Sequence, residues 1–340
     1  MRPRTSLLAV LLIAAAPSLA ADQPSSAKQG PPAWAYPMLP NANPQAPLPS
    51  TPTPAPSDPD PTPIIVPNSK VTFTKAQIRD LANVPDWHPD NHPPAPDVVL
   101  HGAGLGVPAC GFCHLPNGLG RPENASLAGL PEAYILQQIA DMKNGSRHSA
   151  QPLMGPPRLM ATIAKLANDE DVRIAAAYFA KLKLKPWIRV VETATVPKSK
   201  VAGAMYVAIE GDEKELLGTR ILEVPEDTRR AEARDSESGF IAYVPLRSVA
   251  RGEIIAMHGV LSKNKGKVTP CVACHGADLR GLGPVPALAG RSPSYLVRQL
   301  YDLQHGTRAG LWSALMKNAV ENMDEADMVA IAAYAASREP

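Results

Sequence analysis

The sequence predicts a mainly helical protein, with two small all-α modules, a short antiparallel β insert between them and a proline-rich, disordered N-terminal arm. Three observations lead to this prediction. A five-residue motif occurs twice in the 340 residues, the residues that follow each copy are also alike, and proline dominates a stretch ahead of the first copy. Similarity at one fixed offset indicates a duplicated structural unit.

The repeated motif is C-x-x-C-H, the attachment signature of c-type haem. Two thiols about one helical turn apart can form thioethers with the two vinyl groups of one porphyrin, and the histidine then lies beneath the iron as its proximal ligand. We therefore expect two covalently bound haem c groups. The expected attachment residues are Cys110, Cys113, Cys271 and Cys274, and the expected proximal ligands are His114 and His275.

Zinc binding and thiol redox chemistry are the alternatives for these cysteines. A zinc site needs four ligands from neighbouring Cys or His pairs, and a thioredoxin-like motif needs a βαβ context. All four cysteines of the chain lie in the two motifs. None is left for a disulfide, a cysteine axial ligand or a separate metal site, so haem attachment explains the cysteines best.

The first 20 residues resemble a signal peptide cleaved near Ala20. They contain Arg2 and Arg4, an apolar run over 7–16 and then Ser18, Leu19 and Ala20 before the next alanine. The apolar run is too short to span a bilayer comfortably, although a retained anchor is the alternative. Export agrees with haem attachment, which takes place outside the bacterial cytoplasm, so we expect a periplasmic protein without a membrane span. Cleavage would lower the net charge from +2 to about zero, which disfavours a nucleic-acid partner.

Residues 21–70 form the proline-rich linker. Proline at this density removes backbone donors and favours extended polyproline II, so we expect a disordered tether. Trp34 and Tyr36 are candidate anchors for a partner protein, but a simple spacer is the favoured interpretation. A short helix is expected over 74–81. His88, His92 and His101 are candidate distal haem ligands, although surface positions are favoured for all three.

The similarity between the copies extends beyond the motif. Over 110–147 and 271–308, 12 of 38 positions are identical without a gap. Ser292 and Pro293 can begin a helix in the second copy and Gly306 can end it, while Pro131 and Gly145 occupy similar ends in the first. The identical pairs after the motif include Tyr134/Tyr295, Gln138/Gln299, Asp141/Asp302, Gly145/Gly306 and Arg147/Arg308.

A methionine recurs at one point in both copies, now at an offset of 156. Met160 and Met316 each precede by eight residues a candidate N-cap, Asn168 or Asp324, of a final amphipathic helix. Methionine more often fills a core, but its repetition makes Met160 and Met316 the expected distal ligands. A thioether ligand favours ferrous iron and raises the reduction potential. Met154 is the rival of Met160, and Met323 is the weaker rival of Met316.

Each proximal histidine also needs an acceptor for its second ring nitrogen. The carbonyl of Pro284 is the expected acceptor for His275, and Pro122 is the approximate equivalent for His114.

Residues 187–245 differ in character from both modules. Short runs rich in Val, Ile, Thr and aromatic residues alternate with Gly, Pro and charge. We expect four strands in a small antiparallel sheet, over 187–196, 204–209, 218–224 and 240–244, with 226–238 as a charged exposed loop. A docking surface and a structural brace are both open as roles for the insert. A helix over 249–257, followed by an exposed His258, begins the second module.

These motifs resemble the class I c-type cytochromes, specifically the two-domain di-haem periplasmic type typified by cytochrome c-four, with modules similar to cytochrome c553. The resemblance covers 108–183 and 246–340. It implies cytochrome c domains at about 71–186 and 246–340, with His114 and Met160 on one iron and His275 and Met316 on the other. The arm and the insert depart from the family pattern, which leaves open whether the two haem domains pack face to face.

The family resemblance implies an electron carrier between a periplasmic dehydrogenase or quinol-oxidising complex and a downstream acceptor such as a terminal oxidase. No nucleophile or acid/base pair accompanies the haem motifs, so we expect a protein that is not an enzyme. A dedicated cytochrome subunit of one dehydrogenase is the alternative, and a di-haem peroxidase is a less favoured one. Thiosulfate-oxidising di-haem enzymes with a cysteine ligand are excluded by the four cysteines already assigned.

Overall fold

A computed structural model of the chain describes residues 30–38, 60–103, 106–262 and 265–340. Residues 31–340 form one unit, and the fold described below is that of this unit. The expected signal peptide, its cleavage site and residues 39–59 of the expected tether lie outside the described residues. Within the described residues, no helix is both long and apolar enough to cross a bilayer.

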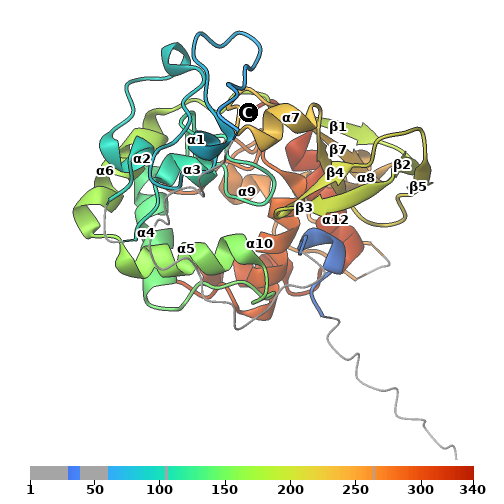
Figure 1. The fold of residues 1–340 in the computed structure, drawn as a ribbon. Helices are drawn as coiled ribbons and strands as arrows, with labels where there is room; N and C mark the ends of the chain where they lie inside the picture. The colour runs from blue at the N-terminus through green and yellow to red at the C-terminus, as the bar shows by residue number, and fades with distance from the viewer. Residues whose placement is uncertain (1–29, 39–59, 104–105, 263–264) are drawn as a thin grey trace, which may run out of the picture. The chain divides into compact units, whose positions relative to one another are not determined.

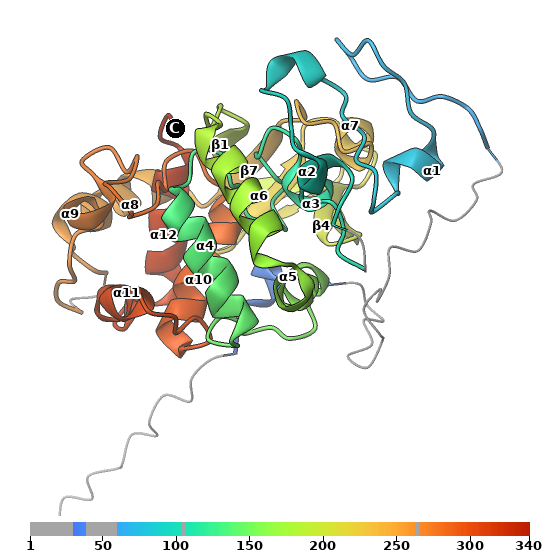
Figure 2. The ribbon, with the colours of Figure 1, turned by 90° about the vertical axis from the view of Figure 1, so that its left-hand side faces the viewer.

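The first module consists of short helices around the first motif, drawn from blue to green in Figure 1. Thr74 caps the first of them through a capping box with Gln77, close to the helix expected over 74–81. Figure 2 shows the fourth and sixth α-helices lying against each other, and their contact is part of the module core. The helices are α1 (Lys75–Ile78), η2 (Pro89–Asn91), α2 (Asp97–Leu100), α3 (Cys110–His114), α4 (Glu132–Lys143), α5 (Gly155–Leu166) and α6 (Asp169–Lys181).

The second module also consists of helices around its motif, and the caps expected for its long helix and its last helix are present. Ser292 accepts a hydrogen bond from the Tyr295 amide, and Gly306 ends the same helix in the left-handed conformation at φ 75°. Asp324 caps the last helix, as Asn168 caps α6. His258 is exposed, as expected. The helices are α8 (Ser248–His258), α9 (Val272–His275), α10 (Pro293–His305), α11 (Ser313–Val320) and α12 (Glu325–Ala336).

The insert differs from the single antiparallel sheet that the sequence predicts. It contains three small sheets, ordered β1-β7-β6, β2-β5 and β3-β4, and β1 runs parallel to β7 with Ile188 opposite Phe240. The long run over 187–196 breaks at Thr193 and Ala194, so it supplies two strands to different sheets. The strands are β1 (Ile188–Glu192), β2 (Thr195–Pro197), β3 (Ser199–Ala202), β4 (Met205–Ala208), β5 (Lys214–Leu216), β6 (Leu222–Pro225) and β7 (Phe240–Val244).

The prediction of a charged exposed loop over 226–238 is wrong. This segment contains helix α7 (Thr228–Glu232), capped by Asp227, and Ala231, Ala233 and Asp235 are buried. Charged residues of this segment can be buried because partners from distant parts of the sequence bind them. Asp235, for example, contacts His88 at 2.9 Å between carboxylate and ring nitrogen.

The insert also contacts the second module. The carboxylate of Glu223 on β6 is buried and accepts hydrogen bonds from the Ser292 hydroxyl at 2.8 Å and the Ser294 amide at 2.9 Å. Burial raises the pKa of Glu223, although these hydrogen bonds oppose the shift. Trp187 donates its indole N–H to the Gly290 carbonyl at 3.0 Å. Glu223 therefore adds an acceptor to the N-terminus of α10, next to its Ser292 cap.

Residues 31–37 fold onto the chain itself instead of forming a tether. They contain the 3₁₀ helix η1 (Ala33–Ala35), and Tyr36 is 1% exposed within the core of the second module. Trp34 donates its indole N–H to Glu325 at 2.7 Å. Both residues considered as anchors for a partner therefore bind within this chain. This proline-rich segment therefore packs against the fold through Trp34 and Tyr36.

The core of the second module depends on a close approach of α8 and α12. A Cβ atom added to Gly252 would lie 1.9 Å from the Ala330 carbonyl oxygen and 2.7 Å from the Tyr334 Cβ. Only glycine allows the two helices this separation. Most of α12 is buried as a result, which explains why its sequence is nearly all alanine and other apolar residues.

We predict that Gly252→Ala lowers the free energy of unfolding by about 3 kcal/mol, because overpacking forces the two helices apart. Gly155→Ala is the matched control, since Gly155 also lies in a helix but has nothing within 4 Å of an added Cβ. Urea denaturation followed by far-ultraviolet circular dichroism measures both. Equal stability of the two variants would contradict the close packing of α8 and α12.

Candidate haem sites and the contact between them

The first motif lies on α3, at one wall of a large cavity. The His114 ring points into this cavity, and its Nδ1 atom donates to the Ala125 carbonyl at 2.8 Å. A carbonyl oxygen can only accept, so Nδ1 carries the proton and Nε2 is left with a lone pair for a metal. Burial lowers the pKa of His114, which keeps the imidazole neutral. The ring is therefore oriented and protonated as an iron ligand requires.

The second motif lies on α9 with the same arrangement. His275 is 6% exposed, and its Nδ1 donates to the Pro286 carbonyl at 2.8 Å. Burial lowers its pKa as well. Ala125 and Pro286 are equivalent positions at the offset of 161. Each of these two histidines is thus held by the carbonyl that lies eleven residues after it.

These acceptors correct the sequence prediction. Pro284 is exposed and does not hold His275, and the Pro122 carbonyl accepts from the Arg298 guanidinium at 2.5 Å instead of from His114. The reason is a turn that repeats after each histidine. Gly120 donates its amide to the His114 carbonyl at 2.9 Å, and Gly281 donates to the His275 carbonyl at 2.8 Å. This turn points the chain outward before it returns to the ring.

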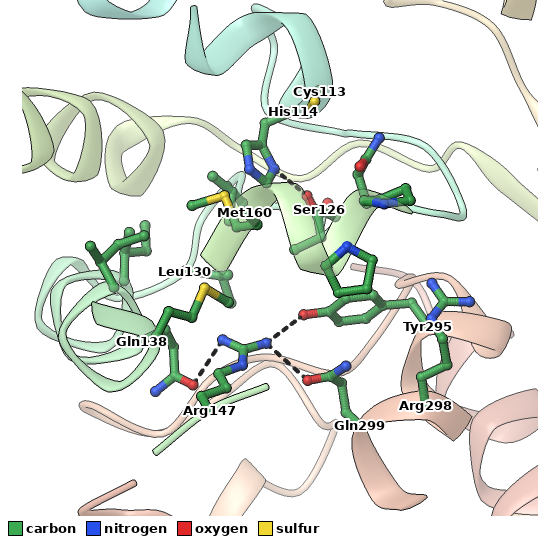
Figure 3. A pocket seen from close by; sticks show the side chains of 18 of the residues that line it. Cys113, His114, Ser126, Leu130, Gln138, Arg147, Met160, Tyr295, Arg298 and Gln299 are labelled. Carbon is green, nitrogen blue, oxygen red and sulfur yellow. Dashed lines mark hydrogen bonds between the residues drawn. The ribbon is translucent and has the colours of Figure 1, made fainter. Parts of the chain in front are cut away.

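The four methionines considered as distal ligands have different surroundings. Met160 on α5 lines the cavity that His114 enters, and Figure 3 shows both side chains reaching into it. Met154, its rival, is 0% exposed and packs in the core of the second module. Met316 on α11 is partly buried against that same core, while Met323 lies within it at 6% exposure.

The cavity suits a large flat cofactor. About 1570 Å³ inside it is not filled by protein atoms, and this space includes open solvent at the mouth. Cys110 and Cys113 stand beside the histidine at its wall. The apolar lining includes Leu127, Leu130, Ile135, Ile139, Leu159 and Ile163.

One side of the cavity is cationic. Arg147, Arg291 and Arg298 are buried and line it, and none lies within ion-pair distance of a carboxylate among the described residues. Burial lowers the pKa of Arg291 to about 10. The carboxylates of Glu123 and Asp302 also line the cavity and compensate the three arginines only in part. Uncompensated buried charge is costly, so an anionic group would be stabilised there. A haem carries two carboxylates on one edge, and its attachment and ligand residues are present, so the residues fit haem.

The structure shows that two of the three other candidate histidines are buried, against the prediction of surface positions. His88 is 5% exposed and contacts the buried Asp235, so it is not a surface residue. The His92 ring is also buried, between Asp86 at 3.2 Å and the Tyr178 hydroxyl at 3.1 Å. His101 is exposed, as favoured. The partner that fixes the His88 ring, Asp235, is 147 residues away, and the Tyr178 hydroxyl that covers His92 is 86 residues away, so no local pattern reveals either contact.

The repeated polar residues form a reciprocal contact between the modules. Arg147 of the first module donates to Tyr295 at 3.1 Å and Gln299 at 2.9 Å of the second. Arg308 donates in return to Tyr134 at 2.7 Å and Gln138 at 2.9 Å. Figure 3 shows Arg147 at the floor of the first cavity.

Backbone hydrogen bonds strengthen this contact. His148 donates its amide to the Thr307 carbonyl at 2.8 Å, and Ala309 donates to the Ser146 carbonyl at 2.7 Å. The donors and the acceptors are again equivalent at the offset of 161. The sequence did hint at this contact, because polar residues that are identical in both copies are not explained by packing in a hydrophobic core. Their pairing across the modules was not predicted.

We predict that Met160→Leu removes the weak long-wavelength absorption band of methionine-ligated ferric haem from one of the two haems. Leucine preserves volume but has no sulfur to bind iron. Met154→Leu is the matched control and should keep the full band. Optical spectra of the oxidised holoprotein measure both. Loss of the band in the Met154 variant alone would reverse the assignment.

We predict that Arg308→Gln uncouples the unfolding of the two modules. The variant loses two charged hydrogen bonds across the contact, each worth about 1.5–3 kcal/mol. Urea unfolding, followed through the haem absorption, should change from one transition to two. Arg338→Gln, at an exposed position, should behave like the parent protein. A single unshifted transition in both variants would show that the contact contributes little.

No model of a protein family matches the chain. Over 233 residues the chain is 26% identical to the thiosulfate dehydrogenase electron acceptor of Thiomonas intermedia, covering 68% of this chain and 78% of that protein. Over 82 residues it is 38% identical to cytochrome c-554(548) of Halomonas halodenitrificans, covering 24% of this chain and 99% of that protein.

The solved structure of the thiosulfate dehydrogenase TsdBA of Marichromatium purpuratum matches 68% of this chain and 37% of its own, at 25% identity and a TM-score of 0.44. The match to nearly all of a c-type cytochrome agrees with the two C-x-x-C-H helices and their oriented histidines. The chain belongs to the class I c-type cytochromes, as a di-haem electron-transfer member with two covalently bound haem c groups.

Proposed function

We propose that this cytochrome accepts electrons from a thiosulfate-oxidising dehydrogenase in the periplasm and passes them to a downstream acceptor. The observation that carries the proposal is the reciprocal contact of Arg147 and Arg308, which joins both haem sites in one body. A two-haem relay needs its sites held together, because electron transfer falls steeply with distance. Two relatives whose names describe electron acceptors of thiosulfate dehydrogenase match this chain over 68% and 69% of its length.

The haem ligands are part of the proposal. Cys110 and Cys113 would hold the first haem, with His114 and Met160 on its iron. The second haem would be held by Cys271 and Cys274, with His275 and Met316 on its iron. The shared orientation of both histidines and the place of Met160 in the first cavity support this set. Each iron would supply a one-electron couple, and in the first module the apolar side chains that line the cavity would surround the haem.

The domain boundaries and location are also proposals. We propose cytochrome c domains at 71–186 and 246–340 and a β-rich insert at 187–245. The signal-peptide pattern and the external attachment of haem c support a periplasmic location. The C-terminal helix of each domain, α6 or α12, packs near its own attachment motif, which supports treating each module as a haem-binding unit.

A freely diffusing carrier is the second candidate. It is favoured by relatives named cytochrome c4, one of which matches 68% of this chain at 24% identity. The two candidates differ in how firmly the cytochrome binds its donor. A dedicated acceptor should remain with its dehydrogenase during purification from native cells at moderate salt, whereas a diffusing carrier should separate.

We predict that a thiosulfate dehydrogenase with thiosulfate reduces both haems of the holoprotein, at a rate proportional to enzyme concentration. Stopped-flow absorbance of the haem bands measures this rate. Thiosulfate without enzyme is the control, and it should leave the haems oxidised on the same timescale. Reduction no faster with enzyme than without it would refute the proposed donor, while leaving the electron-transfer assignment intact.

A further inference from the structure

Segment 231–237 of the insert contacts the first module beside the first haem motif. The Trp87 indole donates to the Ala233 carbonyl at 2.8 Å, and Arg121 donates to the Ala231 carbonyl at 3.1 Å. Asn117 donates to the Ser236 carbonyl. Trp87, Arg121 and Asn117 all belong to the first module, so the segment is fixed against it at several points.

Arg234 lies at the centre of this segment and has an unusual backbone. Its φ is +57°, in the left-handed region that favours glycine. Non-glycine residues keep such conformations only where the surroundings require them, and these often lie at functional sites. Here the conformation directs the side chain onto the attachment helix α3. The guanidinium carbon lies 3.5 Å from the Phe112 ring centroid, and Nη1 donates to the Phe112 carbonyl at 2.7 Å.

No carboxylate lies within ion-pair distance of Arg234 in the part of the chain that the structure describes. Glu123, the carboxylate that acts on Arg234, already forms an ion pair with Arg121. Arg234 contacts Phe112, the residue next to Cys113 in the motif. The surroundings of the Cys113 attachment therefore carry one uncompensated positive charge.

The second motif lacks this charge. The positions equivalent to Phe112, Arg121 and Glu123 are Ala273, Leu282 and Pro284, all uncharged. Ala273 and Cys274 are exposed, whereas Phe112 is 7% exposed. Arg308 acts on His275 of the second motif, but no residue equivalent to Arg234 contacts Ala273 among the described residues. The two attachment sites therefore have different charged neighbours although their sequences are duplicated.

We propose that Arg234 raises the reduction potential of the first haem and so makes the two haems unequal. Reduction adds one negative charge to the iron porphyrin. A fixed cation near the attachment stabilises that reduced form, and it acts strongly because burial lowers the local dielectric constant. The insert thereby raises the reduction potential of one haem only, so a single electron resides preferentially on the haem of the first module. The inference rests on the two haem sites and not on the identity of the electron donor.

Spectroelectrochemical titration of the full-length holoprotein tests this proposal. For Arg234→Gln we expect one of two midpoints to fall, with the reduced fraction ratio at fixed electrode potential changing about tenfold, or ~59 mV for one electron. The component that shifts should be the one whose methionine band disappears in Met160→Leu. Arg234→Lys should retain most of the parent potential. Arg229→Gln, an exposed arginine on the preceding helix α7, is the matched control and should change neither midpoint.

Unchanged midpoints in Arg234→Gln, or equal shifts of both midpoints, would overturn the proposal. If this variant fails to bind both haems, Glu123→Gln provides the test in the opposite direction. Removing the partner of Arg121 leaves a second uncompensated cation, so the same component should become easier to reduce. A first-haem midpoint that does not rise in Glu123→Gln would also overturn it.

Discussion

The reciprocal contact of Arg147 and Arg308 is the constraint on which the arrangement of the two haem sites depends. Each guanidinium donates to a tyrosine and a glutamine of the other module and also to the glutamine of its own. Such a contact is possible only if the two modules meet about an approximate two-fold axis, because equivalent residues must reach equivalent partners. The duplicated sequence therefore specifies both the modules and the way in which they meet.

The contact also makes the first haem site a joint construction. Arg147 comes from the first module, whereas Arg291, Arg298 and Tyr295 come from the second, and all four line one cavity. A haem bound in this cavity would bring carboxylates that could compensate these buried cations. Haem binding would then also favour association of the two modules.

The insert and the N-terminal segment break the symmetry that the duplication creates. Glu223 and Trp187 connect the insert to the start of α10, while segment 231–237 connects it to the first motif. Tyr36 packs in the core of the second module only. The insert contacts both modules, as a brace would. Because its charged residues approach only the first attachment site, it also gives two similar haems different surroundings.

The sequence by itself determined the local features. The two haem motifs, the caps Ser292 and Asp324 and the helix over 249–257 were predicted because each depends on neighbouring residues and on hydrogen bonds within one turn. The tertiary structure alone decided the rest. The carbonyls of Ala125 and Pro286 accept from the two motif histidines because a turn brings the chain back to each ring. His88 is bound by Asp235, which is 147 residues away in the sequence. The three small sheets, the docking of Tyr36 and the approach of Arg234 to Phe112 likewise join distant segments, and local patterns do not encode such pairings.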